Sequence, residues 1–311
     1  MAAWLAVRTS KTAVTQLLRI AWPTVGSILA RVNTDIDAQV DRLDGLGRIG
    51  IDEISYKRGH RYLVVVIDHD SGQLVWAAPG RDRATVERFF DDLGPERSAA
   101  LSHVTADGAD WIAAAVRARA PQAIQCADPF HVVAWASEAL DVERRRAWNE
   151  ASGRRPVGLH QHRSQGDARK LRRARYALWK NPDRLTDRQH HQLDWIAKTD
   201  PRLWRAYLLK EAMRYVFAVK GEQGKAALDR WLSWARRSRL PAFIQLATRV
   251  RAHRAAIDAT LEHRLSNALV ESTNTKIRLL TRVAFGFHGP EPVIALALLA
   301  LGPQPPQLPG R

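Results

Sequence analysis

The chain has 311 residues, with 48 Lys and Arg against 32 Asp and Glu, so its formal net charge is +16 at pH 7. A composition of 46% hydrophobic and 26% charged residues excludes a disordered or fibrous chain, and the length allows roughly two domains. The single cysteine, Cys126, excludes a disulfide framework and a cysteine zinc site. No apolar run reaches the ~18 residues that span a bilayer, and the N-terminus does not read as a signal peptide. We therefore expect a cytoplasmic protein with a polyanion, not a membrane, as its partner.

The positive charge is concentrated in one third of the chain. Residues 151–250 contain 23 Lys and Arg against 8 Asp and Glu. Clustered arginines with interleaved tryptophans are typical of surfaces that contact phosphate and stack on bases. Tryptophans at helical spacing also pack in cores, which is the interpretation we favour for most of these. Because no strand pattern occurs here, we predict a basic, all-helical insertion over residues 151–264.

The N-terminal segment, residues 1–45, begins with a basic stretch. Ser10 or Thr12 can cap a first helix, and Pro23 suits the first turn of a second helix that runs to Arg31. Two short helices joined by a tight turn are typical of a helix-turn-helix, whose second helix, with Arg31, would enter the major groove of DNA. An ordinary helical hairpin is the alternative.

After this segment the hydrophobic pattern becomes that of an α/β domain. We expect strands over residues 48–54, 61–68, 73–78, 101–106 and 123–127, and helices over residues 85–93, 111–120, 130–148, 266–283 and 290–301. Three strands joined by turns, followed by alternating helices and strands, predict a ribonuclease H-like mixed sheet flanked by helices. Its two parts would be residues 46–150 and 265–302, and residues 303–311 would form a disordered tail.

This topology could bring the carboxylates of three acids together in one site. Asp52 is expected to end the first strand, Asp107 follows the fourth, and Glu271 lies on the helix after the insertion. The first and fourth strands should be neighbours at the centre of the sheet, so their ends can bring Asp52 and Asp107 together. Converging carboxylates repel each other unless a cation joins them, and oxygen ligands favour Mg²⁺ or Mn²⁺. Two such ions would support phosphodiester chemistry.

Each of these acids also has a simpler interpretation as a turn or cap residue. Asp128 is the alternative to Asp107, because it follows the fifth strand and precedes a proline that keeps it out of helical geometry. His131 is either a supporting residue for this acid or a helix cap. Glu53 should point to the face of the strand opposite Asp52.

A second group of residues is expected to contact DNA. Glu271, Asn274 and Arg278 lie at i, i+3 and i+7, on one face of a helix, which would supply a metal ligand and two phosphate contacts or else a solvated polar face. The expected DNA contacts are Arg31, Lys57, Arg58, His60, Asn274, Lys276 and Arg278. The chain has no P-loop, nucleophile elbow or HExxH motif that would favour a different chemistry.

Several blocks of sequence together carry a family resemblance. They are Asp52-Glu-Ile-Ser-Tyr-Lys-Arg-Gly-His60, Val66-Ile-Asp68-His-Asp-Ser-Gly72, Asp128-Pro-Phe-His-Val132, Trp231-Leu-Ser-Trp-Ala-Arg-Arg-Ser238 and Ser266-Asn267…Glu271-Ser-Thr-Asn274-Thr-Lys-Ile-Arg278…Phe285-Gly-Phe-His288. Over nearly the whole chain, these blocks resemble the transposases of bacterial insertion sequences, in the ISL-three-type branch with a DDE catalytic domain. The resemblance implies a ribonuclease H-like core in which Asp52, Asp107 and Glu271 act with Mg²⁺ on transposon-end DNA.

The resemblance also sets the functional expectations. Members of this branch usually begin with a Cys-rich zinc ribbon, which one cysteine cannot form, so we expect a truncated or mis-started chain. We expect a nucleoid-associated DNA transposase that binds double-stranded terminal repeats and target DNA as a homo-oligomer, cleaves the ends and transfers the strands. The alternatives are a catalytically inactive relic that only binds DNA or represses the element, and a nuclease that cleaves without joining.

Overall fold

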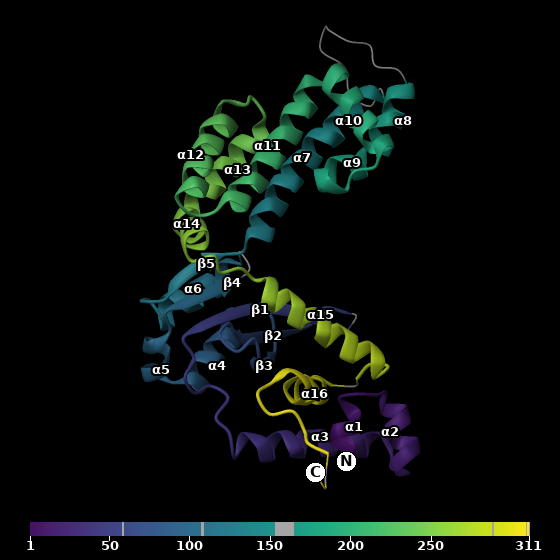
Figure 1. The fold of residues 1–311 in the computed structure, drawn as a ribbon, viewed down its shortest axis with the longest axis vertical. Helices are drawn as coiled ribbons and strands as arrows, with labels where there is room; N and C mark the ends of the chain where they lie inside the picture. The colour runs from purple at the N-terminus through teal and green to yellow at the C-terminus, as the bar shows by residue number, and fades with distance from the viewer. Residues whose placement is uncertain (58, 107–108, 153–164, 288, 309, 311) are drawn as a thin grey trace. The chain divides into compact units, whose positions relative to one another are not determined.

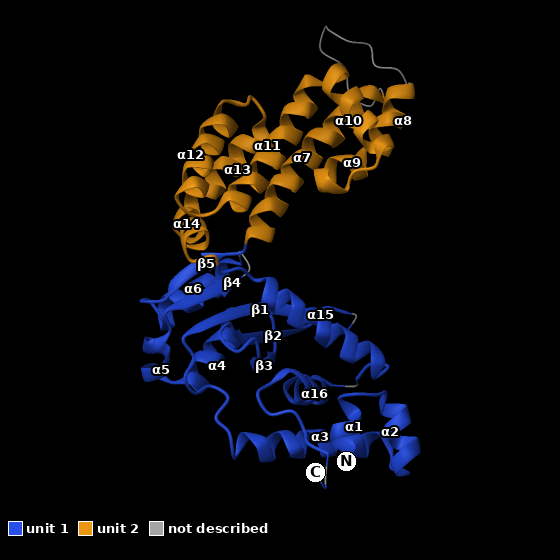
Figure 2. Ribbon diagram, in the orientation of Figure 1, with its two compact units in different colours: residues 1–128, 265–311 blue, residues 129–264 orange. Residues whose placement is uncertain are grey.

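The computed structural model describes residues 1–57, 59–106, 109–152, 165–287, 289–308 and 310 (Figure 1). The chain divides into two compact units, the first formed by residues 1–128 and 265–311 and the second by residues 129–264 (Figure 2). The first unit contains the sheet, and the second is helical throughout its described part. No helix in the described ranges is long and apolar enough to cross a membrane.

The first unit is built around a five-stranded mixed sheet. Its strands are β1 (Arg48–Lys57), β2 (Arg61–Asp68), β3 (Leu74–Pro79), β4 (His103–Ala106) and β5 (Ile124–Ala127). They lie in the order β3-β2-β1-β4-β5; β2 is antiparallel to both β1 and β3, whereas β4 is parallel to both β1 and β5. The predicted α/β class, the five strands and the central pairing of the first strand with the fourth are confirmed.

The first strand is longer than predicted, and this places Asp52 in its interior. β1 continues to Lys57 because it pairs with β2 along a hairpin, with Lys57 opposite Arg61. Its parallel partner β4 ends at Ala106, opposite Ile51. The prediction that the strand ends at its acids was therefore wrong, since the antiparallel partner continues past them. Asp52 is still the first residue of β1 beyond its described pairing with β4.

Helices cover both faces of the sheet. One face carries α15 (Ala268–Val283) and α16 (Glu291–Leu301), with α1 (Ala2–Ala6), α2 (Lys11–Leu18) and α3 (Trp22–Asp37) beside them; the other carries α4 (Arg83–Leu93) and α6 (Asp110–Arg119), with α5 (Pro95–Ala100) next to α4. Along β2, Leu63 and Val65 enter the first core, whereas Val64 and Val66 enter the second. Burial of alternate residues on opposite faces explains the uninterrupted apolar run of this strand.

The second unit is a bundle of helices. They are α7 (Pro129–Ala151), α8 (Gln165–Arg173), α9 (Arg175–Trp179), α10 (Asp187–Thr199), α11 (Pro201–Val219), α12 (Gly221–Arg237), α13 (Pro241–Ala252) and α14 (Arg254–His263), with a 3-10 turn at Pro182–Arg184. The unit begins earlier than the expected insertion at residue 151, because α7 packs along its length on α11 and α13.

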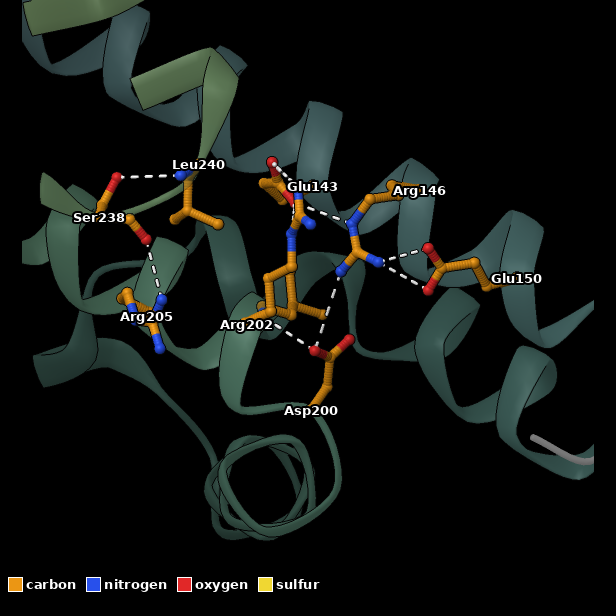
Figure 3. A network of polar contacts seen from close by, with 9 residues as sticks. Glu143, Arg146, Glu150, Asp200, Arg202, Arg205, Ser238 and Leu240 are labelled. Carbon is orange, nitrogen blue, oxygen red and sulfur yellow. Dashed lines mark hydrogen bonds and ion pairs between the residues drawn. The ribbon is translucent and has the colours of Figure 1, made fainter. Parts of the chain in front are cut away.

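A buried ion-pair network joins α7 to α11 (Figure 3). Glu143 is 2% exposed, and its Oε2 accepts hydrogen bonds from Nε of Arg146 and Nε of Arg202, both at 2.9 Å. Arg146 also donates to Glu150, at 2.5 and 2.6 Å. A buried carboxylate is tolerated when cations compensate it, and removing one partner leaves an uncompensated charge. The network therefore fixes the position of α7 along α11.

Candidate active site

Asp52 lies on the central strand of the sheet, and its side chain faces α15. The residue is 9% exposed. Two residues further along β1, Ile54 enters the core that contains Val270 of α15, whereas Ile51 enters the core on the opposite face. The alternation of a strand therefore puts Gly50, Asp52 and Ile54 together on the face that α15 covers.

Hydrogen bonds from Glu53 and from Asn274 hold the carboxylate of Asp52. Its Oδ1 accepts from the backbone N–H of Glu53 at 2.7 Å, and its Oδ2 accepts from Nδ2 of Asn274 on α15 at 2.8 Å. Asn274 was expected to contact phosphate, but it is 3% exposed and its amide is engaged with Asp52. Its Oδ1 is buried and has no hydrogen-bond partner among the described residues. Such an oxygen would be stabilised by a further donor or by a cation.

Gly50 allows α15 to approach this closely. A Cβ at position 50 would lie 2.5 Å from Cγ2 of Val270, 3.0 Å from Nε2 of His69 and 3.1 Å from Oγ1 of Thr105. Val270 is fully buried, so its side chain cannot move out into solvent. The missing side chain therefore sets the distance between β1 and α15, on which the contact between Asp52 and Asn274 depends.

A chain of polar contacts lies under the start of α15. Thr105 donates from Oγ1 to Oδ1 of Asn267 at 2.6 Å, so its oxygen accepts from Nε2 of His69 at 2.8 Å. This assigns the Nε2 proton of the imidazole. Burial and, secondly, the charge of Arg48 lower the pKa of His69. The sequence did not predict these residues as part of the site, although Asn267 stands in the block that contains Glu271.

The parallel strands are in register beside Asp52. β1, β4 and β5 are paired at Ile51, Ala106 and Ala127. Asp52 directly follows Ile51 in β1, and Asp128 directly follows Ala127 at the end of β5. Asp128 is 3% exposed. Asp107 lies outside the described residues, so its role stays a prediction.

Glu271 lies in the first turn of α15 and is half-buried. It precedes Asn274 by one turn, so both belong to adjoining positions on one side of the helix. Within the described residues, which do not include Asp107, no group of three or more His, Cys, Asp and Glu side chains is placed to hold a metal. The acid triad is therefore still a prediction. Two of its members, Asp52 on β1 and Glu271 on α15, lie on elements that the hydrogen bond from Asn274 to Asp52 joins.

Two of the expected phosphate contacts, Lys57 and Arg278, line one groove of about 480 Å³. We call it the β1–α15 groove; its lining residues are Ile54, Ser55, Tyr56, Lys57, Arg278, Thr281, Arg282, Phe285 and Gly286. Arg282, one turn after Arg278, is a third cation, which was not among the residues predicted from the sequence. There is no carboxylate among these lining residues, so the groove is positively charged.

The other expected DNA contacts are spread over the molecule. Arg31 is exposed on α3, Lys276 is exposed on α15, and His60 is exposed in the turn after β1, with a φ of 58°. Arg58 lies outside the described residues. His131 is half-buried in the first turn of α7, in the second unit.

Part of the basic excess of the second unit is exposed on two neighbouring helices, α8 and α9. The exposed cations there are Arg169, Lys170, Arg172, Arg173 and Arg175. The guanidinium of Arg175 lies 4.1 Å from the ring centre of Trp179, which is 37% exposed. Of the five tryptophans of the basic region Trp231 is buried, Trp195 and Trp204 are half-buried, and Trp179 and Trp234 are exposed. Trp179 lies at the surface beneath a cation.

The fold and site define an α/β protein with a buried acid on the central strand and a basic groove beside it. A family model described as Transposase, that of the ISL3-type DDE transposases, matches residues 49–296. The chain is 64% identical over 320 residues to the transposase for insertion sequence element IS1557 of Mycobacterium tuberculosis, covering 99% of this chain and 72% of that protein. It is 28% identical over 283 residues to the transposase for insertion sequence element IS1001 of Bordetella parapertussis, covering 90% of this chain and 66% of that protein. The chain therefore belongs to the ISL3-type family of insertion-sequence transposases, which confirms the resemblance stated above.

Proposed function

We propose that this chain cleaves insertion-sequence ends in a metal-dependent reaction and transfers the strands into target DNA, with Asp52, Asp107 and Glu271 as its catalytic acids. The observation that carries this proposal is the hydrogen bond of 2.8 Å between Asn274 and Asp52, which are 222 positions apart. It holds the helix that bears Glu271 against the strand that bears Asp52. Membership of the transposase family supports the same reaction class.

The residues present fit a hard divalent cation, Mg²⁺ or Mn²⁺. The donors are oxygen atoms: the carboxylate of Asp52, and the buried Oδ1 of Asn274, which lacks a partner among the described residues. Asp52, Asp107 and Glu271 would hold the ions, with Asp128 as the alternative to Asp107. When bound, such ions activate an attacking hydroxyl and stabilise the leaving oxygen of a phosphodiester.

The other residues of the site would position and neutralise the substrate. Asn274 and the backbone of Glu53 hold the Asp52 carboxylate in one orientation. Lys57, Arg278 and Arg282 would contact the phosphates of the bound strand. Both cleavage and joining are phosphoryl transfers, whose acceleration depends on orientation and on neutralisation of the developing charge.

We assign further parts of the chain to DNA binding within this proposal. The strand order supports a ribonuclease H-like catalytic domain. α2 and α3, separated by residues 19–21, would form a helix-turn-helix that presents Arg31 to the major groove. The exposed cations of α8 and α9 would hold the phosphate backbone, so binding should weaken steeply with salt. Two paired ends would require a homo-oligomer.

The test is a cleavage and strand-transfer assay on the element's own ends, with Mg²⁺ or with a chelator. We expect Asp52→Asn and Glu271→Gln each to lower the cleavage rate by about 100-fold or more, and the chelator to stop the reaction. The matched control is Glu53→Gln, because Glu53 is the next residue but pairs with Arg81. It should stay within about threefold of wild type, since it adds no transition-state contact.

Other outcomes identify the alternatives. Equal loss in Asp52→Asn and Glu53→Gln would contradict the assignment of Asp52. Wild-type protein that binds genuine ends without cleaving them would be a DNA-binding relic, and cleavage without joining would indicate a nuclease.

A further inference from the structure

Phe285 is exposed to an unusual degree and in an unusual backbone conformation. It is 78% exposed, more than any other large hydrophobic residue in the described parts of the chain. Its φ of 58° lies in the left-handed region, which a bulky residue rarely adopts. An aromatic side chain held outward at a backbone cost suggests a binding role.

The turn that presents Phe285 is firmly held. Its backbone N–H donates to the carbonyl of Arg282 at 3.0 Å, as the last turn of α15 closes. Ala284 on one side is 3% exposed, and Phe287 on the other is 9% exposed and belongs to the core. The ring of Phe287 also lies 4.2 Å from Nζ of the buried Lys11 on α2. Both flanks are therefore anchored, whereas Phe285 points to solvent.

The exposed ring lies at the β1–α15 groove, which is lined by three cations and by no described carboxylate. A purely apolar partner would leave Lys57, Arg278 and Arg282 without compensation as it covered them. A nucleotide offers both an anionic phosphate for the cations and a flat base for the ring. Bases inside a duplex are already stacked, so the ring can reach only a base that is unpaired.

We infer that the β1–α15 groove binds an unpaired nucleotide of a DNA strand, with its cations on the phosphate and Phe285 stacked on the base. The inference rests on the proposed transposase function and adds to it a site for unpaired DNA close to the strand that carries Asp52. Phe285 is then a binding residue that recognises a DNA end with unpaired nucleotides, either opened or overhanging.

The test compares two duplexes of the same paired sequence, taken from the element's end: one blunt and one with a four-nucleotide single-stranded extension. Dissociation constants are measured by fluorescence anisotropy for the full chain. We expect wild type to prefer the extended DNA, and Phe285→Ala to weaken binding of that DNA by about 10-fold while changing the blunt duplex by less than about twofold. Phe285→Trp should retain the preference, because it keeps a stacking ring.

The matched control is Leu279→Ala. Leu279 is 60% exposed on α15 but does not line the groove. It should leave both affinities unchanged. Arg282→Ala should lower the slope of log K against log salt by about 0.7 on the extended DNA, the value for one single-strand phosphate contact.

Three results would overturn the inference. They are no preference of wild type for the extended DNA, an equal effect of Phe285→Ala on both duplexes, and an effect of Leu279→Ala as large as that of Phe285→Ala. If wild type still cleaves and joins ends in the assay above, only the groove assignment fails. Wild type that binds neither duplex would overturn the proposed function as well.

Discussion

Replacing Gly50 with alanine should move α15 away from the sheet. The added Cβ would lie 2.5 Å from Cγ2 of Val270, whereas carbon atoms in contact lie about 3.5–4.0 Å apart, so one element must shift by about 1 Å. Overpacking of this kind costs about 1–3 kcal/mol. The same shift would stretch the hydrogen bond from Asn274 to Asp52, now 2.8 Å, beyond bonding range.

Gly50→Ala should lower the rate of end cleavage by a larger factor than its loss of folding stability alone would explain. Gly50→Ala is measured by urea denaturation, for the free energy of unfolding, and by the end-cleavage assay. Gly47→Ala is the matched control, because a Cβ there would meet only Oδ2 of Asp70, at 3.9 Å. We expect Gly47→Ala to change stability by less than about 0.5 kcal/mol and to keep wild-type cleavage.

A second substitution should relieve the first. Val270→Ala alone leaves a small cavity and costs about 2 kcal/mol, but combined with Gly50→Ala it removes the closest contact. The double variant should therefore be more stable than the sum of the single effects by about 1 kcal/mol or more, and it should regain cleavage. Wild-type stability and activity in Gly50→Ala, or strict additivity in the double variant, would refute the packing argument.

Two further predictions concern the helices. Glu143→Gln leaves Arg146 and Arg202 without their shared anion and should cost about 2–3 kcal/mol, below the value for fully buried pairs because the Arg202 side chain is 42% exposed; unchanged hydrogen exchange in α7 and α11 would contradict this. Asp82 caps α4 by accepting from the hydroxyl of Thr85 at 2.7 Å and from its N–H at 2.8 Å, and these bonds lower the pKa of Asp82. At pH values above 3.8, the ordinary pKa of an aspartate, Asp82→Ala should lower the free energy of unfolding by about 1 kcal/mol. This difference from wild type should vanish as the pH falls through the lowered pKa of Asp82 in the folded state. Asp82→Asn should keep most of the cap without that pH dependence, and a wild-type advantage over alanine that persists in strong acid would oppose the assignment.

Much of the fold could be predicted because its signals are local. The apolar run of β2 reflects burial on both faces of the sheet, and the longer helices repeat their apolar residues over several turns. The helices α1 and α5 were missed because five or six residues contain less than two turns of pattern. The family could likewise be identified from blocks of sequence alone, since these blocks do not depend on how elements pack.

Only the tertiary structure decided what surrounds Asp52. From its helical position Asn274 was expected to contact phosphate, yet it donates to Asp52 because Gly50 lets α15 approach β1. Arg282 joins Lys57 in one groove because pairing with β2 prolongs β1 alongside the second half of α15. A single sequence records the periodicity within each element, and so it determined the sheet, the helices and the acids available. The distance between two elements depends on how their side chains interlock, and no local pattern contains it.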